Sequence, residues 1–410
     1  MLDLKIAAII SEYNPLHNGH LYHINKTREE ASADAVICVM SGNFVQRGTP
    51  ALIDKWKRAD FALNNGIDLV IELPVLYSLS SAEFFAYGAV SLLNSLGIVD
   101  ILSFGSECGS ADTLLDFAKI LAEEPEELSN DIKHYLKEGV PFPAAREKAL
   151  SDYIRNKNNG NSQESLINLL NSSNNILGIE YCKSLIKLNS SINPFSIQRE
   201  GGTYNSNTLN SIFSSATSIR KHISENNSIQ GLERHVPEYV FNSLQDLIFT
   251  DYNFTFEDSI IPYVKYKYFS SSSNIENLPD VSEGIHNKIF KALESFNCHK
   301  DIVSNIKSKR YTYTRINRIL CQYFIGFEQY DTKALRKEPC PYARILGFNK
   351  TGAEVLKKIK ANSSIPFYTK LPKKTDDVLK LDLQSTKVYS LLNNKILPSS
   401  DYLTSPLILK

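Results

Sequence analysis

The first 125 residues alternate short apolar runs with longer amphipathic segments. The apolar runs, which are nearly continuous in Val, Ile and Leu, are KIAAIISE (5–12), DAVICVMSG (34–42), DLVIELP (68–74) and VDILSFGSE (99–107). Helix-like segments over 19–32, 54–66 and 81–97 separate them. Strands that are apolar on both faces and alternate with helices indicate a parallel sheet covered on both sides. The pattern therefore predicts an α/β fold with a doubly wound parallel sheet, whose ligands belong at the carboxyl ends of its strands.

The pattern changes after this segment. Residues 112–188 are mostly helical, interrupted by an Asn/Gly/Ser-rich loop at 156–165, and NPFSIQRE (193–200) follows as a further strand. A polar loop then leads into a helix over 201–223, SSSSN (270–274) is the best linker, and the remainder, including 311–327 and 353–360, is largely helical. A chain of 410 residues exceeds one usual core. We expect two domains, 1–225 with the sheet and helical insertions, and 226–410, mostly helical.

Composition places the chain among ordinary globular proteins. Hydrophobic residues make up 42% and charged residues 22%. The six cysteines form no CxxC pair, so neither a disulfide framework nor a structural zinc site is indicated, and a reducing cytoplasm fits best. The apolar run near the N-terminus is too short for a signal sequence or a membrane span.

The formal net charge of zero conceals an uneven distribution along the chain. Residues 1–300 hold 25 Lys and Arg against 36 Asp and Glu, whereas residues 301–410 hold 20 against 9. A basic segment of this kind can bind a polyphosphate such as RNA and gain affinity from counterion release. A solvated basic surface that only keeps the protein in solution is the alternative reading.

Two of the eight histidines stand in NPLHNGH, where the first strand joins the first helix. Free N–H groups and the positive dipole end make a helix start suitable for a phosphate, and Gly19 lets the phosphate approach the backbone. The imidazoles of His17 and His20 can donate to oxygens on which negative charge builds. Alternatives are helix-end histidines satisfied by backbone groups, or a metal site with His23, which lacks the HExxH pattern. Phosphate handling is the favoured interpretation.

A second motif, SSATSIR (214–220), supports a phosphate site. Ser215 and Thr217 offer hydroxyls and Arg220 a fixed charge at a helix start, a set suited to a departing pyrophosphate. Together, HxGH and this motif resemble the nucleotidyltransferase superfamily that shares its fold with class I aminoacyl-tRNA synthetases. The resemblance implies a Rossmann-like HxGH nucleotidyltransferase domain in which both motifs grip the ATP phosphates.

The blocks EYNPLHNGHLYH (12–23), VMSGNFVQRGTPALIDKWKRADFAL (39–63), DLVIELP, FGSE (104–107), SNNILGIEY (173–181), IQR (197–199) and SATSIR narrow the match. They resemble the bacterial tRNA(Met) cytidine acetate ligase family, from which Leu16 departs where Phe is frequent. The resemblance implies an ATP-dependent ligase that forms acetyl-adenylate and acetylates N4 of the wobble cytidine of elongator tRNA(Met). It implies ATP as substrate, Mg²⁺ as cofactor without a predicted protein ligand, and tRNA(Met) and acetate as partners, with no membrane and no inferable protein partner.

The resemblance also implies site residues. His17, His20 and Arg220 would be catalytic. Residues expected to bind ATP are Ile10, Ser11, Glu12, Tyr13, Asn14, Pro15, Leu16, His17, Asn18, Gly19, His20, Leu21, Tyr22, His23, Gly105, Asn174, Arg199, Ser215 and Thr217. Spacing to Arg199 favours Asn174 over Asn175. Read alone, Gly105 also fits a strand-end turn, Asn174 a helix cap and Arg199 a surface ion pair.

Two further segments are candidates for contacts with acetate or tRNA. YTYTRINRIL (311–320) combines aromatic and basic residues, and GNFVQRG (42–48) and DKWKR (54–58) follow the second strand near the expected site. The candidates are Gln46, Arg47, Lys55, Arg58, Tyr311, Tyr313, Arg315 and Arg318. The alternative is a helix that packs its Tyr and Ile residues inward with solvated arginines, and an ordinary surface role for the others.

Two other functions share some of these features. An adenylyltransferase for a phosphorylated cofactor precursor would also carry HxGH and SxTxIR, but it needs neither acetate nor a basic tail. A nucleotide-sensing RNA-binding protein without catalysis would not need leaving-group stabilisers. We therefore expect a ligase.

Overall fold

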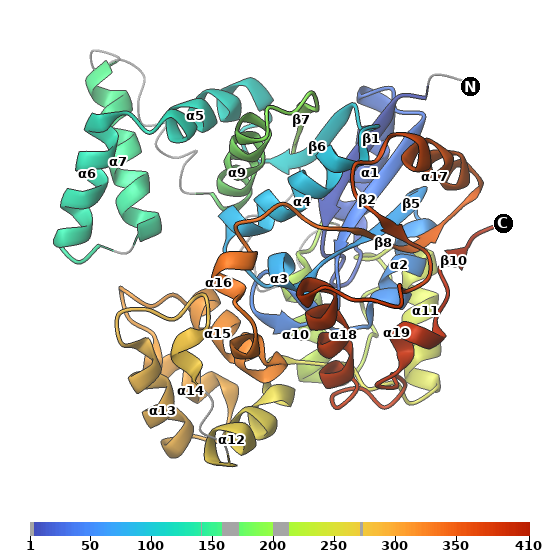
Figure 1. Cartoon of the computed structure of the whole chain (residues 1–410). Helices are drawn as coiled ribbons and strands as arrows, with labels where there is room; N and C mark the ends of the chain where they lie inside the picture. Colours follow the sequence, from blue (N-terminus) through green and yellow to red (C-terminus); the bar gives the residue numbers. More distant parts are fainter. Residues whose placement is uncertain (1–3, 141, 158–171, 200–212, 271–273) are drawn as a thin grey trace.

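The computed structural model describes residues 4–140, 142–157, 172–199, 213–270 and 274–410. Most predicted elements of the first 125 residues are present within one or two residues of the expected bounds. The loop predicted at 156–165 and the linker at 270–274 lie largely outside the described residues. Figure 1 shows a central twisted sheet with helices on both faces and two helical lobes on one side.

The main sheet has the strand order β10-β8-β5-β2-β1-β6-β7, with β9 paired to β8. Its strands are β1 (Ile6–Ser11), β2 (Ala35–Ser41), β5 (Leu69–Leu73), β6 (Ile101–Ser106), β7 (Asn193–Gln198), β8 (Ala343–Phe348), β9 (Phe367–Tyr368) and β10 (Leu407–Ile408). A short antiparallel pair, β3 (Phe44–Val45) and β4 (Thr49–Pro50), lies apart from it. The neighbours from β5 to β7 all pair in parallel, so their carboxyl ends share one edge.

The helices follow the strands in chain order. They are α1 (Asn18–Glu30), α2 (Lys55–Leu63), α3 (Val75–Ser78), α4 (Ala82–Leu96), α5 (Ala111–Glu123), α6 (Glu126–Lys137), α7 (Phe142–Lys157), α9 (Ser173–Lys187), α10 (Ala216–Asn226), α11 (Glu238–Phe249), α12 (Ile261–Ser270), α13 (Ile285–Ser295), α14 (His299–Ile306), α15 (Tyr313–Ile325), α16 (Thr332–Leu335), α17 (Lys350–Asn362), α18 (Asp377–Tyr389) and α19 (Ser400–Leu403). Short 3₁₀ turns are η1 (Glu257–Ile260), η2 (Ile275–Asn277) and η3 (Phe327–Gln329). No helix among the described residues is long and apolar enough to cross a membrane.

Alternate residues of each central strand enter two separate hydrophobic cores. On β1, Ile6 and Ala8 pack into one core, while Ala7 and Ile9 pack into the other. All four side chains are buried to within 1%. A strand in a parallel sheet with both faces covered must be apolar at every position, which explains the continuous runs in the sequence.

The C-terminal part is largely helical, but it also completes the sheet. Strand β8, from the apolar run ARILGF, pairs antiparallel with β5, and β10 pairs with β8. Assigning this segment to the helical tail was wrong, because an isolated six-residue apolar run carries no helical period that separates it from its neighbours. The sheet therefore draws on residues on both sides of the boundary predicted at 225 and 226.

Four charged side chains fasten the C-terminal part to the sheet from inside. Lys55 Nζ lies 2.8 Å from Glu72 Oε1 and 2.8 Å from Asp401 Oδ1. Arg344 Nη1 lies 2.8 Å from the same Asp401 oxygen and 3.5 Å from Glu72 Oε2. The four side chains are at most 6% exposed, so each charge depends on the others for compensation.

Replacing Asp401 with Asn should lower the free energy of unfolding by about 3 kcal/mol, because two buried cations would then share one carboxylate. Urea denaturation measures this change. Asp377→Asn is the matched control, since its partner Lys380 is 50% exposed and the exposed pair is screened by water. Equal unfolding midpoints for the two variants would contradict the role of the buried network.

Candidate active site

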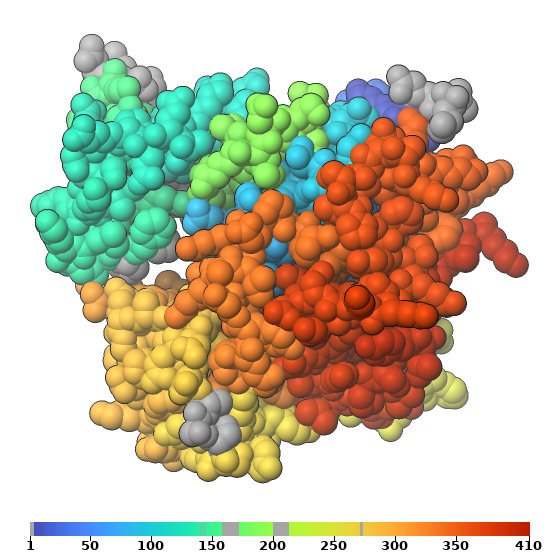
Figure 2. Space-filling model, in the orientation of Figure 1, coloured from blue at the N-terminus to red at the C-terminus, as the bar shows by residue number. Residues whose placement is uncertain are grey.

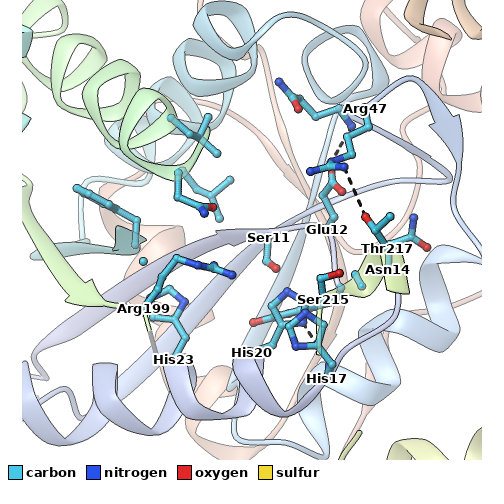
Figure 3. A pocket seen from close by; sticks show the side chains of 18 of the residues that line it. Ser11, Glu12, Asn14, His17, His20, His23, Arg47, Arg199, Ser215 and Thr217 are labelled. Carbon is cyan, nitrogen blue, oxygen red and sulfur yellow. Dashed lines mark hydrogen bonds between the residues drawn. The ribbon is translucent and has the colours of Figure 1, made fainter. Parts of the chain in front are cut away.

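A cavity of about 190 Å³ lies where the carboxyl ends of β1, β6 and β7 meet the starts of α1, α9 and α10. The residues that line it are Ile10, Ser11, Glu12, Tyr13, Asn14, His17, His20, His23, Gln46, Arg47, Phe85, Phe104, Gly105, Asn174, Leu177, Tyr181, Arg199, Ser215, Ala216, Thr217 and Arg220. Figure 3 shows the histidines, Arg199 and Ser215 around one end and Arg47 with Glu12 at the other. The sheet edge predicted for ligands is thus the edge that holds the cavity.

His17 and His20 cap the first turn of α1 reciprocally. His17 Nδ1 accepts a hydrogen bond from the backbone N–H of Gly19 at 3.1 Å, and His20 Nδ1 accepts one from the backbone N–H of His17 at 3.2 Å. A neutral imidazole carries one proton, so both rings must carry it on Nε2. Each Nε2–H is then a donor that the backbone does not use. The backbone-satisfied interpretation and the phosphate interpretation of this pair are therefore compatible.

Burial keeps these imidazoles neutral. The rings stack with centroids 3.7 Å apart. Desolvation, reinforced by the charges of Arg199 and Arg220, lowers the pKa of His17 to about 3. Desolvation, with His17 and Arg199 beside it, also brings the pKa of His20 well below the usual value of about 6.5. His23, whose Nε2 lies 3.0 Å from Ser103 Oγ, has its pKa lowered to about 4, mainly by burial.

The cavity has an excess of positive charge. Arg47, Arg199 and Arg220 line it, and Glu12 is the one carboxylate among the described lining residues. Arg220 Nη1 donates to the backbone oxygen of Asn14 at 2.8 Å, which fixes the guanidinium beside the end of β1. Three arginines around one cavity suit a ligand with several negative charges.

The start of α10 adds hydroxyl groups to the same cavity. Ser215 Oγ caps the helix by accepting from the backbone N–H of Ser218 at 3.1 Å. Thr217 Oγ1 lies 3.4 Å from Arg220 Nη2 and 3.5 Å from Arg47 Nη1. The two motifs, two hundred residues apart in the chain, therefore meet at one site.

Glu107 is a residue that sequence reasoning missed. Asn174 Nδ2 donates to its Oε1 at 2.6 Å, and Ser172 Oγ donates to its Oε2 at 2.6 Å. Asn175 is fully buried and accepts from the backbone N–H of Glu107 at 2.9 Å. The geometry favours Asn174, whose amide oxygen is left for the cavity, as the ligand-facing asparagine. Glu107 belongs to the FGSE block, which was the available signal.

Not every residue expected at the ATP site lines this cavity. Gly19 and Tyr22 line a smaller adjoining cavity of about 50 Å³, next to Arg199. Pro15, Leu16, Asn18 and Leu21 line neither cavity; Leu16 is buried in the core, and Asn18 Nδ2 donates to the backbone oxygen of Arg234. Conversely, an apolar wall of Phe85, Phe104, Leu177 and Tyr181 had no signal in the motifs. Across the described parts of the chain, no three His, Cys, Asp or Glu side chains form a metal-binding group.

Lys55 and Arg58 do not fit the acetate or tRNA contacts we expected. Both are 0% exposed. Lys55 belongs to the buried ion network, and Arg58 donates to the backbone oxygens of Glu12, Ser41, Gly42 and Ile53. Arg58 thus holds the ends of β1 and β2 together beneath the cavity. Gln46 and Arg47, from the same blocks, do line the cavity.

The segment 311–320 is also less accessible than expected. Tyr311 is 6% exposed, and its hydroxyl donates to the backbone oxygen of Glu283 at 2.7 Å. Arg318 is 8% exposed and lies 2.6 Å from Asp280 Oδ2, while Arg315 donates to Ser282 Oγ at 2.6 Å. Only Tyr313, 46% exposed, remains open for a stacking contact among these four described residues.

Comparisons with known proteins give a consistent result. The family model described as HIGH Nucleotidyl Transferase matches residues 4–402. The tRNA(Met) cytidine acetate ligase of Clostridium novyi (strain NT) is 55% identical over 407 residues, covering 99% of this chain and 100% of that protein. The enzyme of that name from Clostridium tetani is 53% identical over 405 residues, covering 99% and 100%. The crystal structure of Thermotoga maritima TmcAL bound with alpha-thio ATP has a TM-score of 0.88 at 32% identity, covering 99% and 100%.

Two substitutions of His17 separate its two nitrogen atoms. His17→Asn keeps an acceptor at the position of Nδ1, so the helix cap survives, but it removes the distal donor. His17→Gln keeps a distal N–H and loses the cap. If Nε2–H contacts the phosphates, His17→Asn should lower the rate of pyrophosphate release from ATP by about 100-fold or more. His17→Gln should retain more of the rate and lose about 1 kcal/mol of stability.

Pyrophosphate release and thermal unfolding, measured on both variants, check this. A His17→Asn enzyme as active as the wild type would show that the ring acts only as a cap.

Proposed function

We infer that the chain, which belongs to the tRNA(Met) cytidine acetate ligase family of HIGH nucleotidyltransferases, uses ATP to acetylate N4 of the wobble cytidine of elongator tRNA(Met). The products are N4-acetylcytidine, AMP and pyrophosphate. The observation that carries the inference is the arrangement of two neutral imidazoles, each with an unused Nε2–H, among three arginines at a helix start. Such a site binds a triphosphate and stabilises its leaving group.

In the first step, acetate becomes an activated acyl group. A carboxylate oxygen of acetate attacks the α-phosphorus of ATP, a new P–O bond forms, and the bond to the pyrophosphate oxygen breaks. Negative charge moves onto the departing pyrophosphate. His17, His20 and Arg220 stabilise that charge from one side of the cavity, and Arg199 and Thr217 hold the phosphates. The protein contributes positioning and electrostatics rather than a covalent intermediate.

In the second step, the exocyclic amine of cytidine attacks the acetyl carbon of acetyl-adenylate. A C–N bond forms, AMP leaves with the bonding electron pair, and the amine loses a proton. Because the lone pair of that amine is delocalised into the ring, close placement matters more than a strong base. The apolar wall of Phe85, Leu177 and Tyr181 excludes water that would otherwise hydrolyse the anhydride.

We also propose that Mg²⁺ accompanies ATP. Magnesium in nucleotide sites is held by one or two carboxylates, the phosphates and water, and Glu12 is the carboxylate that the described lining offers. Bound there, the ion would neutralise phosphate charge. Glu12 Oε1 already accepts from the backbone N–H of Gln46 at 2.8 Å, which orients the carboxylate.

Elongator tRNA(Met) and acetate are the proposed partners, and the cytoplasm, where tRNA is charged, is the proposed location. We propose that residues 1–225 form most of the catalytic part and that 226–410 contribute to tRNA binding. Among the C-terminal residues first considered, Tyr313 keeps this role because it is exposed.

The test is incubation of the enzyme with labelled acetate, ATP, Mg²⁺ and unmodified elongator tRNA(Met). We expect exchange of label between pyrophosphate and ATP only when acetate is present, and acetyl label in N4-acetylcytidine after nucleoside analysis. Exchange that ignores acetate would contradict the ligase and favour an adenylyltransferase. tRNA binding with no exchange would favour a non-catalytic RNA-binding protein.

A further inference from the structure

We propose that a second hollow, lined by Phe84, Tyr87, Lys187 and Lys337, binds a nucleotide of the tRNA that neighbours the target cytidine. The proposal rests on the proposed function, because it identifies the route by which the RNA reaches the cavity described above. No residue of this hollow belongs to the motifs in the sequence.

The hollow has the size and charge of a nucleotide site. Its volume is about 400 Å³, and its described lining is Glu83, Phe84, Tyr87, Lys183, Ser184, Lys187 and Lys337. Three lysines face one glutamate in this set. Phosphate oxygens are the natural partners of such lysines, and their contacts fix the register of an RNA chain.

The ion pairs in the hollow divide its lysines into two kinds. Lys183 is 5% exposed and is held by Glu83 at 3.0 Å and Glu180 at 2.8 Å, so its charge is compensated. The Lys187 side chain is 48% exposed and lies 3.9 Å from Glu83, at the limit of an ion pair. Lys337 is exposed on the other rim. Lys187 and Lys337 therefore carry the charge that a phosphate would meet.

The hollow also offers aromatic surface. Phe84 and Tyr87 are half-buried on consecutive turns of α4, and the guanidinium of Arg336 lies 4.0 Å from the ring centroid of Phe84. Aromatic rings combined with cations are the usual means of holding an unpaired base, because every base has a face that stacks. A site for phosphate alone has no use for the two rings.

The hollow shares a wall with the active-site cavity. Helix α4 presents Phe84 to the hollow and Phe85 to the cavity, and α9 presents Lys183 to the hollow and Tyr181 to the cavity. Helices α4 and α9 pack against each other, so one pair of helices separates the two spaces. Nucleotides next to each other in one strand could occupy both.

The overall shape agrees with an RNA that enters from this side. In Figure 2, the teal helices α5–α7 and the yellow helices α12–α14 form two projections with a hollow region between them. Lys337 follows α16, which Figure 1 places between the yellow helices and α4. A tRNA anticodon loop is single-stranded and splays its bases, as this arrangement requires.

The test measures tRNA binding and acetate-dependent ATP–pyrophosphate exchange, which needs no tRNA, on the same variants. The double variant Lys187→Gln/Lys337→Gln should weaken tRNA binding at least tenfold and reduce the slope of log affinity against log salt by about 1.5. Phe84→Leu, which keeps apolar volume but loses the ring, should weaken binding about fivefold or more. Exchange should stay at the wild-type level in both.

Matched controls use the same substitutions elsewhere. Lys357→Gln/Lys360→Gln on α17 removes two charges, and Tyr266→Leu removes a ring that is 74% exposed on α12. Wild-type binding by the lysine double variant, or an equal loss in the α17 control, would overturn the proposal. Should Phe84→Leu impair exchange, the exposed lysine pair decides alone. Absence of acetate-dependent exchange in the wild type would contradict the proposed function instead, since tRNA binding is measured separately.

Discussion

The structure of the site depends on two hydrogen bonds at the first turn of α1. Gly19 N–H donates to His17 Nδ1, and His17 N–H donates to His20 Nδ1. These bonds satisfy donors that every helix start leaves unpaired, and they also decide which ring nitrogen carries the proton. A single local interaction thus anchors the helix and aims two N–H donors at the cavity. Burial supports it by keeping both rings neutral, since a protonated Nδ1 could not accept.

The positive charge of the site is arranged around these neutral rings. Arg199 follows β7, Arg220 lies on α10, and Arg47 lies between β3 and β4, so three separate elements bring their guanidinium groups to one edge of the sheet. Beneath the cavity, Arg58 joins the ends of β1 and β2 through backbone oxygens. The buried network around Asp401 ties the C-terminal part to the same sheet. The cavity is therefore built on elements that cannot shift independently.

The sequence allowed prediction of the central strands and of the two phosphate motifs, because both rest on strong local signals. Continuous apolar runs indicate strands buried on both faces, and HxGH at a strand–helix join restricts the ligand. Accessibility could not be read in the same way. Lys55 and Arg58 are charged residues near a predicted site, and their burial depends on distant partners such as Asp401. The strand at 343–348 and the role of Glu107 likewise depend on long-range pairing.

The most direct measurement is ¹⁵N NMR of the ring nitrogens of His17 and His20, with and without an ATP analogue. We expect both rings to show an unprotonated Nδ1 and a protonated Nε2 between pH 8 and pH 5, because their pKa values lie well below this range. The Nε2 signals should shift on binding of the analogue, while the Nδ1 signals stay nearly unchanged. A proton on Nδ1 in either ring, or an imidazolium at pH 7, would contradict the account.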